Sequence, residues 1–188
     1  MSVETILWRR LDTPGHDACR LLRTDDGWRL DGTASFALDG SPASLAYVVD
    51  CDAEWRTRHG SVYGWIGAQS LDFRIMRTVD GGWRLNDESV SGLAECVDLD
   101  LGFTPATNLS QLRRVDLDIG NAADVPVAWL DVQAGTLDRL HQLYERRSAE
   151  SYWYEASRFG YTALLRVNEI GFVERYPGLW ELEGRSTF

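Results

Sequence analysis

The sequence predicts a mainly β fold, in which antiparallel strands form a barrel-like or strongly curved sheet with one or two helices. Short segments of alternating apolar and polar residues recur along the chain, which is the pattern of strands with one buried face. Gly, Pro, Asn and Asp separate these segments at close spacing, as is typical of barrels and sandwiches. Aromatic residues are abundant, with eight Trp, seven Tyr and six Phe, and such side chains fill cores or line cavities.

The alternating segments give the expected strands in chain order. They are Thr5–Leu11, Ala18–Thr24, Gly27–Asp31, Thr33–Asp39, Ser44–Cys51, Ser61–Gly67, Leu71–Thr78, Gly82–Asn86, Glu95–Leu101, Leu112–Ile119, Val125–Val132, Ser151–Ala156, Tyr161–Val167, Gly171–Tyr176 and Leu179–Glu183. One arrangement occurs three times along the chain: a strand, then an Asp/Asn/Gly turn, then a strand that opens with an aromatic residue. It is found at Arg23–Leu30, Arg77–Leu85 and Arg166–Val173. Because these turn residues tolerate positive φ, we expect three similar hairpins.

One segment departs from this rhythm and predicts a helix. Leu137, Leu140 and Tyr144 recur at helical spacing, and Thr136 stands where a helix cap is expected. Basic residues up to Arg147 would lie in the last turn, where the helix dipole favours them. We therefore expect a helix from Leu137 to about Arg147.

Length and charge limit the possible functions. The 188 residues, with no linker or low-complexity tract, suit a single domain over 1–188. The formal net charge is −10 and basic residues are not clustered, which argues against nucleic acid and against an anionic membrane surface. No apolar run is long enough to span a bilayer, so we expect no stable membrane insertion. All 19 basic residues are Arg, which excludes Schiff-base chemistry and phosphate loops that need Lys.

The three cysteines, Cys19, Cys51 and Cys96, indicate a reduced protein. An odd number of widely spaced cysteines gives no disulfide framework and no zinc motif. The first ten residues do not form a basic and then apolar leader. We therefore expect a cytoplasmic protein with three free thiols, of which Cys51 is buried and unreactive.

A search for catalytic motifs is mostly negative. The sequence has no G-x-S-x-G, G-x-G-x-x-G or H-E-x-x-H motif, and His16, His59 and His141 are scattered. Among 29 acidic residues some carboxylates will be close by chance, so a glycosidase-type pair cannot be read from the sequence. We predict no catalytic residue, no metal site and no cofactor.

Strand parity predicts one shared interior. Alternate residues of a strand point to the same face of a sheet. On three of the expected strands, nine residues stand at the alternate positions that are mainly apolar. They are Leu45, Tyr47, Val49, Val97, Leu99, Leu101, Tyr161, Ala163 and Leu165. We expect all nine to face one interior that need not be completely filled.

The same parity argument separates two adjacent arginines. In the expected strand Leu112–Ile119, Arg113 shares the parity of the apolar residues and Arg114 shares that of the acidic ones. We therefore expect Arg113 to point inward and Arg114 outward. A buried guanidinium needs an ion-pair partner or a ligand head group, and the sequence leaves both open.

The most distinctive stretch lies in the middle of the chain. Cys96–Asp100, Thr104–Asn108 and Leu112–Arg114 together resemble the signature of the bacterial putative glycolipid-binding family. Trp55–Arg58, the Gly-Gly-Trp83 hairpin and Gly171–Leu179 extend the resemblance over most of the chain. Leu109–Leu112 departs from the family pattern, which has Thr-Leu-Pro-Ile at this place, so one Pro is lost.

The resemblance implies a ligand rather than a reaction. The family is similar in shape to periplasmic lipoprotein carriers, which hold acyl chains in an open β-barrel, and it supplies no catalytic residue. We therefore expect this chain to bind a glycolipid or another amphipathic small molecule in an aromatic-lined barrel cavity, without catalysis. The candidate ligand-binding residues are Trp55, Arg58, Asn108, Arg113, Trp153 and Tyr176.

Two other functions stay open at this point. An enzyme acting on a sugar or lipid would use Asp or Glu as acid and base, and would show two facing carboxylates with shifted pKa values. A scaffold protein would show a filled interior and a large apolar outer patch. The sequence does not indicate the oligomeric state.

Overall fold

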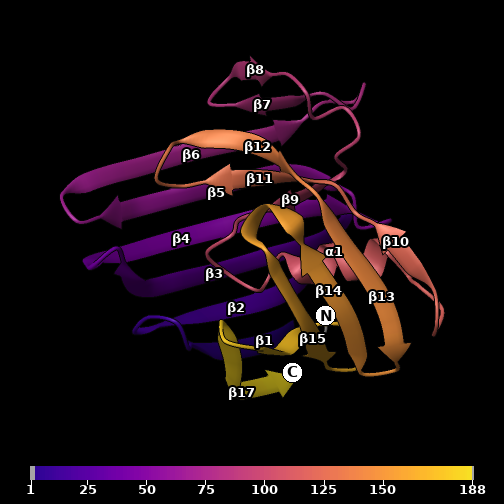
Figure 1. Cartoon of the computed structure of the whole chain (residues 1–188). Coiled ribbons are helices and arrows are strands. Elements are labelled where there is room, and N and C mark those ends of the chain that lie inside the picture. Colours follow the sequence, from indigo (N-terminus) through magenta and orange to yellow (C-terminus); the bar gives the residue numbers. More distant parts are fainter. Residues whose placement is uncertain (1–2, 188) are drawn as a thin grey trace.

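A computed structural model describes residues 3–187, and most of them are in β-strands (Figure 1). The N-terminal half is a meander of antiparallel strands. Its members are β1 (Val3–Arg10), β2 (Gly15–Thr24), β3 (Gly27–Leu38), β4 (Ser41–Asp52), β5 (Thr57–Ile66), β6 (Gln69–Arg77), β7 (Trp83–Leu85) and β8 (Glu88–Val90). Apolar side chains alternate along these strands, so each strand buries one face.

The C-terminal half contains shorter strands and a helix. In chain order its elements are β9 (Asp98–Asp100), α1 (Asn108–Val115), β10 (Ala122–Asp124), β11 (Val127–Asp131), β12 (Thr136–Leu140), β13 (Gln142–Ser148), β14 (Ser151–Ala156), a 3-10 turn (Ser157–Phe159), β15 (Tyr161–Val167), β16 (Val173–Tyr176) and β17 (Trp180–Thr187). The last strand pairs with the first, with Arg10 opposite Trp180, so both halves form one sheet. The three expected hairpins are confirmed as β2–β3, β6–β7 and β15–β16.

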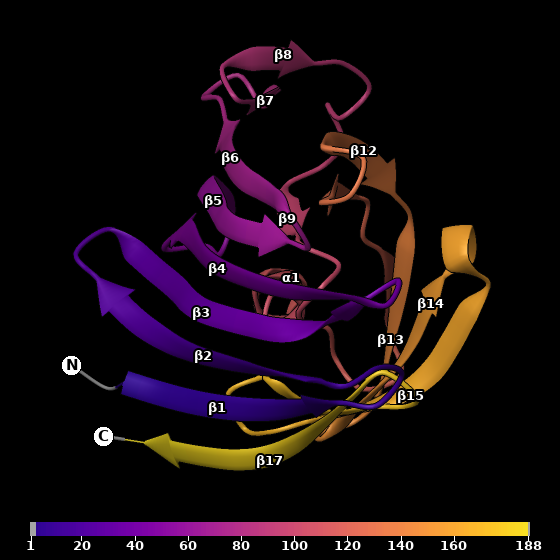
Figure 2. The same ribbon diagram turned by 90° about the vertical axis from the view of Figure 1, so that its left-hand side faces the viewer.

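The large sheet has fourteen strands in the order β10-β13-β14-β15-β16-β17-β1-β2-β3-β4-β5-β6-β7-β8, and a small sheet has the order β12-β11-β9. Figure 2 shows the large sheet curving around α1 and β9, which lie inside it. Within residues 3–187, the edge strands β8 and β10 do not pair with each other. The prediction of a mainly β, antiparallel fold is therefore confirmed, but no closed barrel is found within residues 3–187, and α1 and β9 lie inside the curve of the open sheet.

The predicted shared interior is largely confirmed. Seven of the nine residues are buried in one hydrophobic cluster, and Tyr161 packs against it half-buried. Val97 is the exception, because it is half-buried and not a member of this cluster. The cluster extends from the β1–β6 face through α1 to β13–β15. The core therefore lies between the two arms of the curved sheet.

The expected helix is in the wrong place. Leu137–Arg147 forms parts of two strands, β12 and β13. Regular secondary structure is interrupted at His141, and each strand pairs with a different neighbour. The one α-helix of residues 3–187 is instead Asn108–Val115, which includes the start of the expected strand Leu112–Ile119. Leu109 and Leu112 are buried on it at helical spacing, and this pair was the signal that the sequence offered.

The helix also reverses the prediction for the paired arginines. Arg113 is exposed, and Arg114 is half-buried with a double contact to Asp98 at 2.7–3.0 Å. The strand parity argument was wrong here because helical residues do not alternate between two faces. The prediction for the cysteines is confirmed, since all three are free and buried. Burial raises the pKa of the Cys51 thiol to about 12, which keeps it protonated and unreactive.

Candidate functional site

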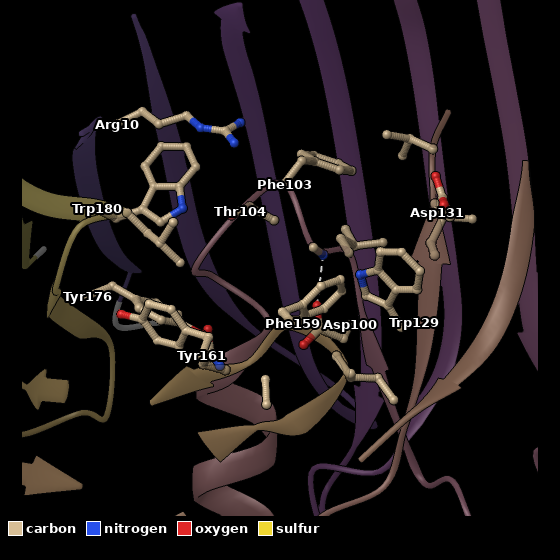
Figure 3. Close-up of a pocket in the computed structure, with 18 of the residues that line it drawn as sticks. Arg10, Asp100, Phe103, Thr104, Trp129, Asp131, Phe159, Tyr161, Tyr176 and Trp180 are labelled. Carbon is tan, nitrogen blue, oxygen red and sulfur yellow. Dashed lines mark hydrogen bonds between the residues drawn. The ribbon is translucent and has the colours of Figure 1, made fainter. Parts of the chain in front are cut away.

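A pocket of about 430 Å³ opens between the ends of β1, β3 and β17, the β9–α1 loop, and strands β11, β12, β14 and β15 (Figure 3). Its walls are mainly apolar, and eight of the residues that line it are aromatic. These residues are Phe36, Phe103, Trp129, Tyr154, Phe159, Tyr161, Tyr176 and Trp180. A concave apolar site with a few polar groups is the usual form of a small-molecule site.

The loop before α1 supplies one wall, and a buried carboxylate holds it in place. Thr104, which lines the pocket, donates a hydrogen bond to Asp17 of β2. Tyr47 of β4 donates to the same carboxylate at 3.0 Å. Asp17 is fully buried, and this burial raises its pKa to about 6, although both hydroxyl donors act in the opposite direction. The wall formed by Phe103 and Thr104 is therefore attached to the main sheet through Asp17.

Three tyrosines form the opposite wall. Tyr154, Tyr161 and Tyr176 contact one another, with ring centroids 5.5–6.2 Å apart. Tyr161 donates its hydroxyl proton to the carbonyl of Pro177 at 2.5 Å, and burial raises its pKa to about 12. These hydroxyls remain protonated at neutral pH, so this wall is uncharged.

A network of buried polar groups lies beneath the pocket. Asn108 donates to the Tyr144 hydroxyl at 2.7 Å, and Tyr144 donates to Gln111 at 2.6 Å. Gln111 and Gln142 donate to the Asp100 carboxylate at 3.4 and 2.7 Å. Only Asn108 and Asp100 of these five residues line the pocket. The network therefore fixes two polar groups at the floor of an otherwise apolar site.

The two carboxylates of the pocket have structural partners. Asp100 also accepts the backbone N–H of Gly102 at 2.7 Å, and burial raises its pKa. Asp131 accepts the backbone N–H groups of Gln133 and Ala134, each at 3.0 Å, and so closes the β11–β12 turn. Each carboxylate holds a turn of the chain, which is not the free, facing pair that acid–base catalysis requires.

Arg10 is the basic residue of the pocket. It is the last residue of β1, and its guanidinium lies 4.7 Å from the ring of Phe36 and 5.3 Å from that of Trp180. Its Nε and Nη2 donate to Asp12 at 2.7 and 3.0 Å. The two rings and the carboxylate hold the guanidinium in place, and Figure 3 shows Arg10 beside Trp180 at one side of the pocket.

The structure brings only two of the six predicted site residues to this pocket, namely Asn108 and Tyr176. Trp55 and Arg113 lie together elsewhere, with the guanidinium 5.4 Å from the ring. Arg58 faces Asp26 at 3.8 Å in an exposed position.

Trp153, the last of the six, is half-buried on the outer face of β14. It donates to Glu155 at 2.7 Å. None of these four residues lines the pocket that contains Asn108 and Tyr176.

Sequence reasoning missed several residues of the pocket, among them Arg10, Trp129 and Trp180. The signal for Arg10 was present, because it shares parity with Ile6 and Trp8 in a segment predicted as a strand, and both are buried. Trp129 and Trp180 carried no comparable signal. Their proximity depends on pairings between strands that are far apart in the sequence.

Two features are absent from the described residues 3–187, namely a metal-binding cluster and a membrane-spanning helix. Across residues 3–187, no group of three or more His, Cys, Asp or Glu side chains could hold a metal ion. Over the same residues, no helix has the length and apolar character that crossing a membrane requires.

Comparison with known proteins identifies the family. The model of the family described as putative glycolipid-binding matches residues 5–182. The chain belongs to this family. A crystal structure of a DUF1089 family protein from Pseudomonas aeruginosa has 26% sequence identity to the chain and a TM-score of 0.78, covering 88% of this chain and 91% of that one. No curated protein matches. The resemblance read from the central motif is thus confirmed, and it extends over nearly the whole chain.

Proposed function

We propose that this protein binds an amphipathic ligand, a glycolipid or another lipid with a polar head group, in the aromatic pocket. The observation that carries the proposal is the pocket itself, about 430 Å³ in volume and walled by aromatic rings over a floor that presents Asn108 and Asp100. Its volume lies in the lower part of the range of about 300–1,000 Å³ usual for ligand sites. This size favours a single acyl chain over a lipid with two chains.

Burial of the ligand's acyl chain would supply most of the binding affinity. Each CH₂ group transferred from water to an apolar wall contributes about 0.8 kcal/mol. The polar floor would orient the head group or the end of the acyl chain, because its polar groups are buried and held by hydrogen bonds. The family's description as glycolipid-binding is consistent with this function. An enzyme is less well supported, since Asp100 and Asp131 are both engaged in turns.

The first test is native mass spectrometry of the protein purified from cells without detergent. We expect an added mass in the range of a single-chain lipid, which is lost on partial unfolding. The pocket-filling variant Ala156→Trp should lack this mass, because Ala156 is buried on the inner face of β14 and lines the pocket.

The matched control is Glu155→Trp, which adds the same side chain to the half-buried outer position of the same strand. It should retain the ligand. Retention of the same added mass by a folded Ala156→Trp protein would contradict the proposed site, and folding of both variants is checked by their melting temperatures.

A further inference from the structure

The guanidinium of Arg10 has a donor that the protein does not use. An Arg side chain carries five N–H groups in a planar fork, and Asp12 occupies the edge formed by Nε and Nη2. Nη1 is buried from solvent, and no acceptor among residues 3–187 lies within hydrogen-bonding distance of it. The side chain as a whole is only 13% exposed.

The residue that carries this unused donor lines the pocket. Arg10 lines the cavity between the rings of Phe36 and Trp180. Figure 3 shows its guanidinium beside Trp180, directed across the cavity toward Phe103. A buried charged donor without an acceptor lowers the stability of the folded protein, because it has lost its hydrogen bonds to water and has gained none in their place. An acceptor that reaches the Nη1 edge from within the cavity would remove this cost.

The charges around the pocket are separated. Arg10 is the only basic residue among the described residues that line it, and the acidic ones are Asp100 and Asp131. In Figure 3 Asp131 lies on the far side of the pocket from Arg10. The free edge formed by Nη1 and Nη2 matches the two oxygens of a carboxylate or phosphate, which guanidinium groups bind in a bidentate manner.

We propose that Arg10 is a recognition residue for an oxyanion, so that the ligand of the aromatic pocket is an amphiphile with a carboxylate or phosphate head group rather than a neutral one. This inference rests on the proposed function, because it places the head group at one side of the same pocket. Asp12 acts as a positioning residue, since it holds the fork with its free edge toward the cavity.

The test compares four single-chain probes of equal chain length by isothermal titration calorimetry. Octanoate and octyl phosphate carry the two oxyanions, whereas octyl β-D-glucoside and 1-octanol are neutral. The wild-type protein should bind one or both anionic probes at least tenfold more tightly than the neutral ones. The stronger of the two anionic probes shows whether carboxylate or phosphate is preferred.

Three variants assign the preference to Arg10. Arg10→Gln should reduce the ratio of anionic to neutral affinity to within about twofold. Arg10→Lys keeps the charge without the fork and should retain part of the advantage. Arg23→Gln is the matched control, because Arg23 also lies over an aromatic ring, 4.5 Å from that of Trp28, but does not line the pocket.

The outcomes separate the two proposals. Equal affinity of the wild-type protein for anionic and neutral probes would overturn the role of Arg10 while the pocket stands. A folded Arg10→Gln protein that keeps the anionic advantage would do the same. Failure of all four probes to bind would contradict the pocket as a lipid site. The comparison of probes on the wild-type protein needs no variant, so instability of Arg10→Gln does not affect it.

Discussion

Asp17 illustrates how a single residue links the pocket to the stability of the sheet. Its carboxylate is fully buried and accepts hydrogen bonds from Tyr47 and Thr104. Burial raises its pKa to about 6, from an ordinary value of 3.8. Between these two values the folded protein holds a proton that the unfolded chain has already lost. Stability from this group is therefore greatest at low pH and decreases as the pH rises toward 6.

This difference predicts the pH dependence of an Asp17→Asn variant. The ionised carboxylate costs the wild-type protein up to about 3 kcal/mol above pH 6, and the variant has no proton to lose. The free energy of unfolding of the wild type relative to Asp17→Asn should therefore decrease as the pH rises from 4 to 6, and then stay level. Urea unfolding across this range measures it, with Asp25→Asn in the exposed β2–β3 turn as control. Parallel curves for the wild type and Asp17→Asn would contradict the raised pKa.

At the scale of elements, the contacts of α1 decide which of its two adjacent arginines contributes more to stability. Arg114 reaches from α1 to Asp98 of β9, whose side chain is fully buried while that of Arg114 is 23% exposed. Burial raises the pKa of Asp98, although the charge of Arg114 acts against it. Arg113 on the same helix is exposed and lies over Trp55. The ion pair, rather than the exposed contact, therefore fixes the helix against the small sheet.

Substitution of each arginine tests this assignment. Arg114→Ala leaves Asp98 buried without its partner and should cost roughly 3 kcal/mol of unfolding free energy, the lower end of the range for breaking a buried pair. Arg113→Ala should cost about 0.5–1 kcal/mol, as for an exposed contact between a cation and a ring. Chemical denaturation of both variants measures the difference. A larger loss for Arg113→Ala would show that α1 is not held by Arg114.

The same elements show where sequence reasoning succeeds and where it fails. Alternation predicted β4 and β15 and their buried faces well, because each buries one face against a core. It failed for α1, since Val115 at the end of the helix and Leu117 after it continue an apparent strand pattern. It failed again at Thr136–Ser148, where two strands joined at His141 imitate helical spacing. A local sequence pattern does not show where one element of secondary structure ends and the next begins.

The whole molecule depends on pairings that no local pattern contains. The pairing of β1 with β17 places Arg10 opposite Trp180, although 169 positions separate them. Within residues 3–187 the large sheet is open, with β8 and β10 at its edges, and α1 and β9 lie inside its curve (Figure 2). The aromatic content of the sequence predicted a lined cavity in general, but which rings line it depends on this arrangement. Of the six site residues predicted from the sequence, the candidate site therefore contains Asn108 and Tyr176. It also contains residues that were not predicted, such as Trp129 and Arg10.

The location of the ligand is the central claim, and the indole N–H signals of the tryptophans test it most directly. Trp129 and Trp180 line the pocket, whereas Trp55 and Trp153 lie outside it. In a ¹H–¹⁵N NMR titration with octyl phosphate and octyl β-D-glucoside, the signals of Trp129 and Trp180 should shift in a saturable manner, and those of Trp55 and Trp153 should not. Saturable shifts confined to Trp55 or Trp153, with Trp129 and Trp180 unchanged, would contradict the aromatic pocket as the ligand site.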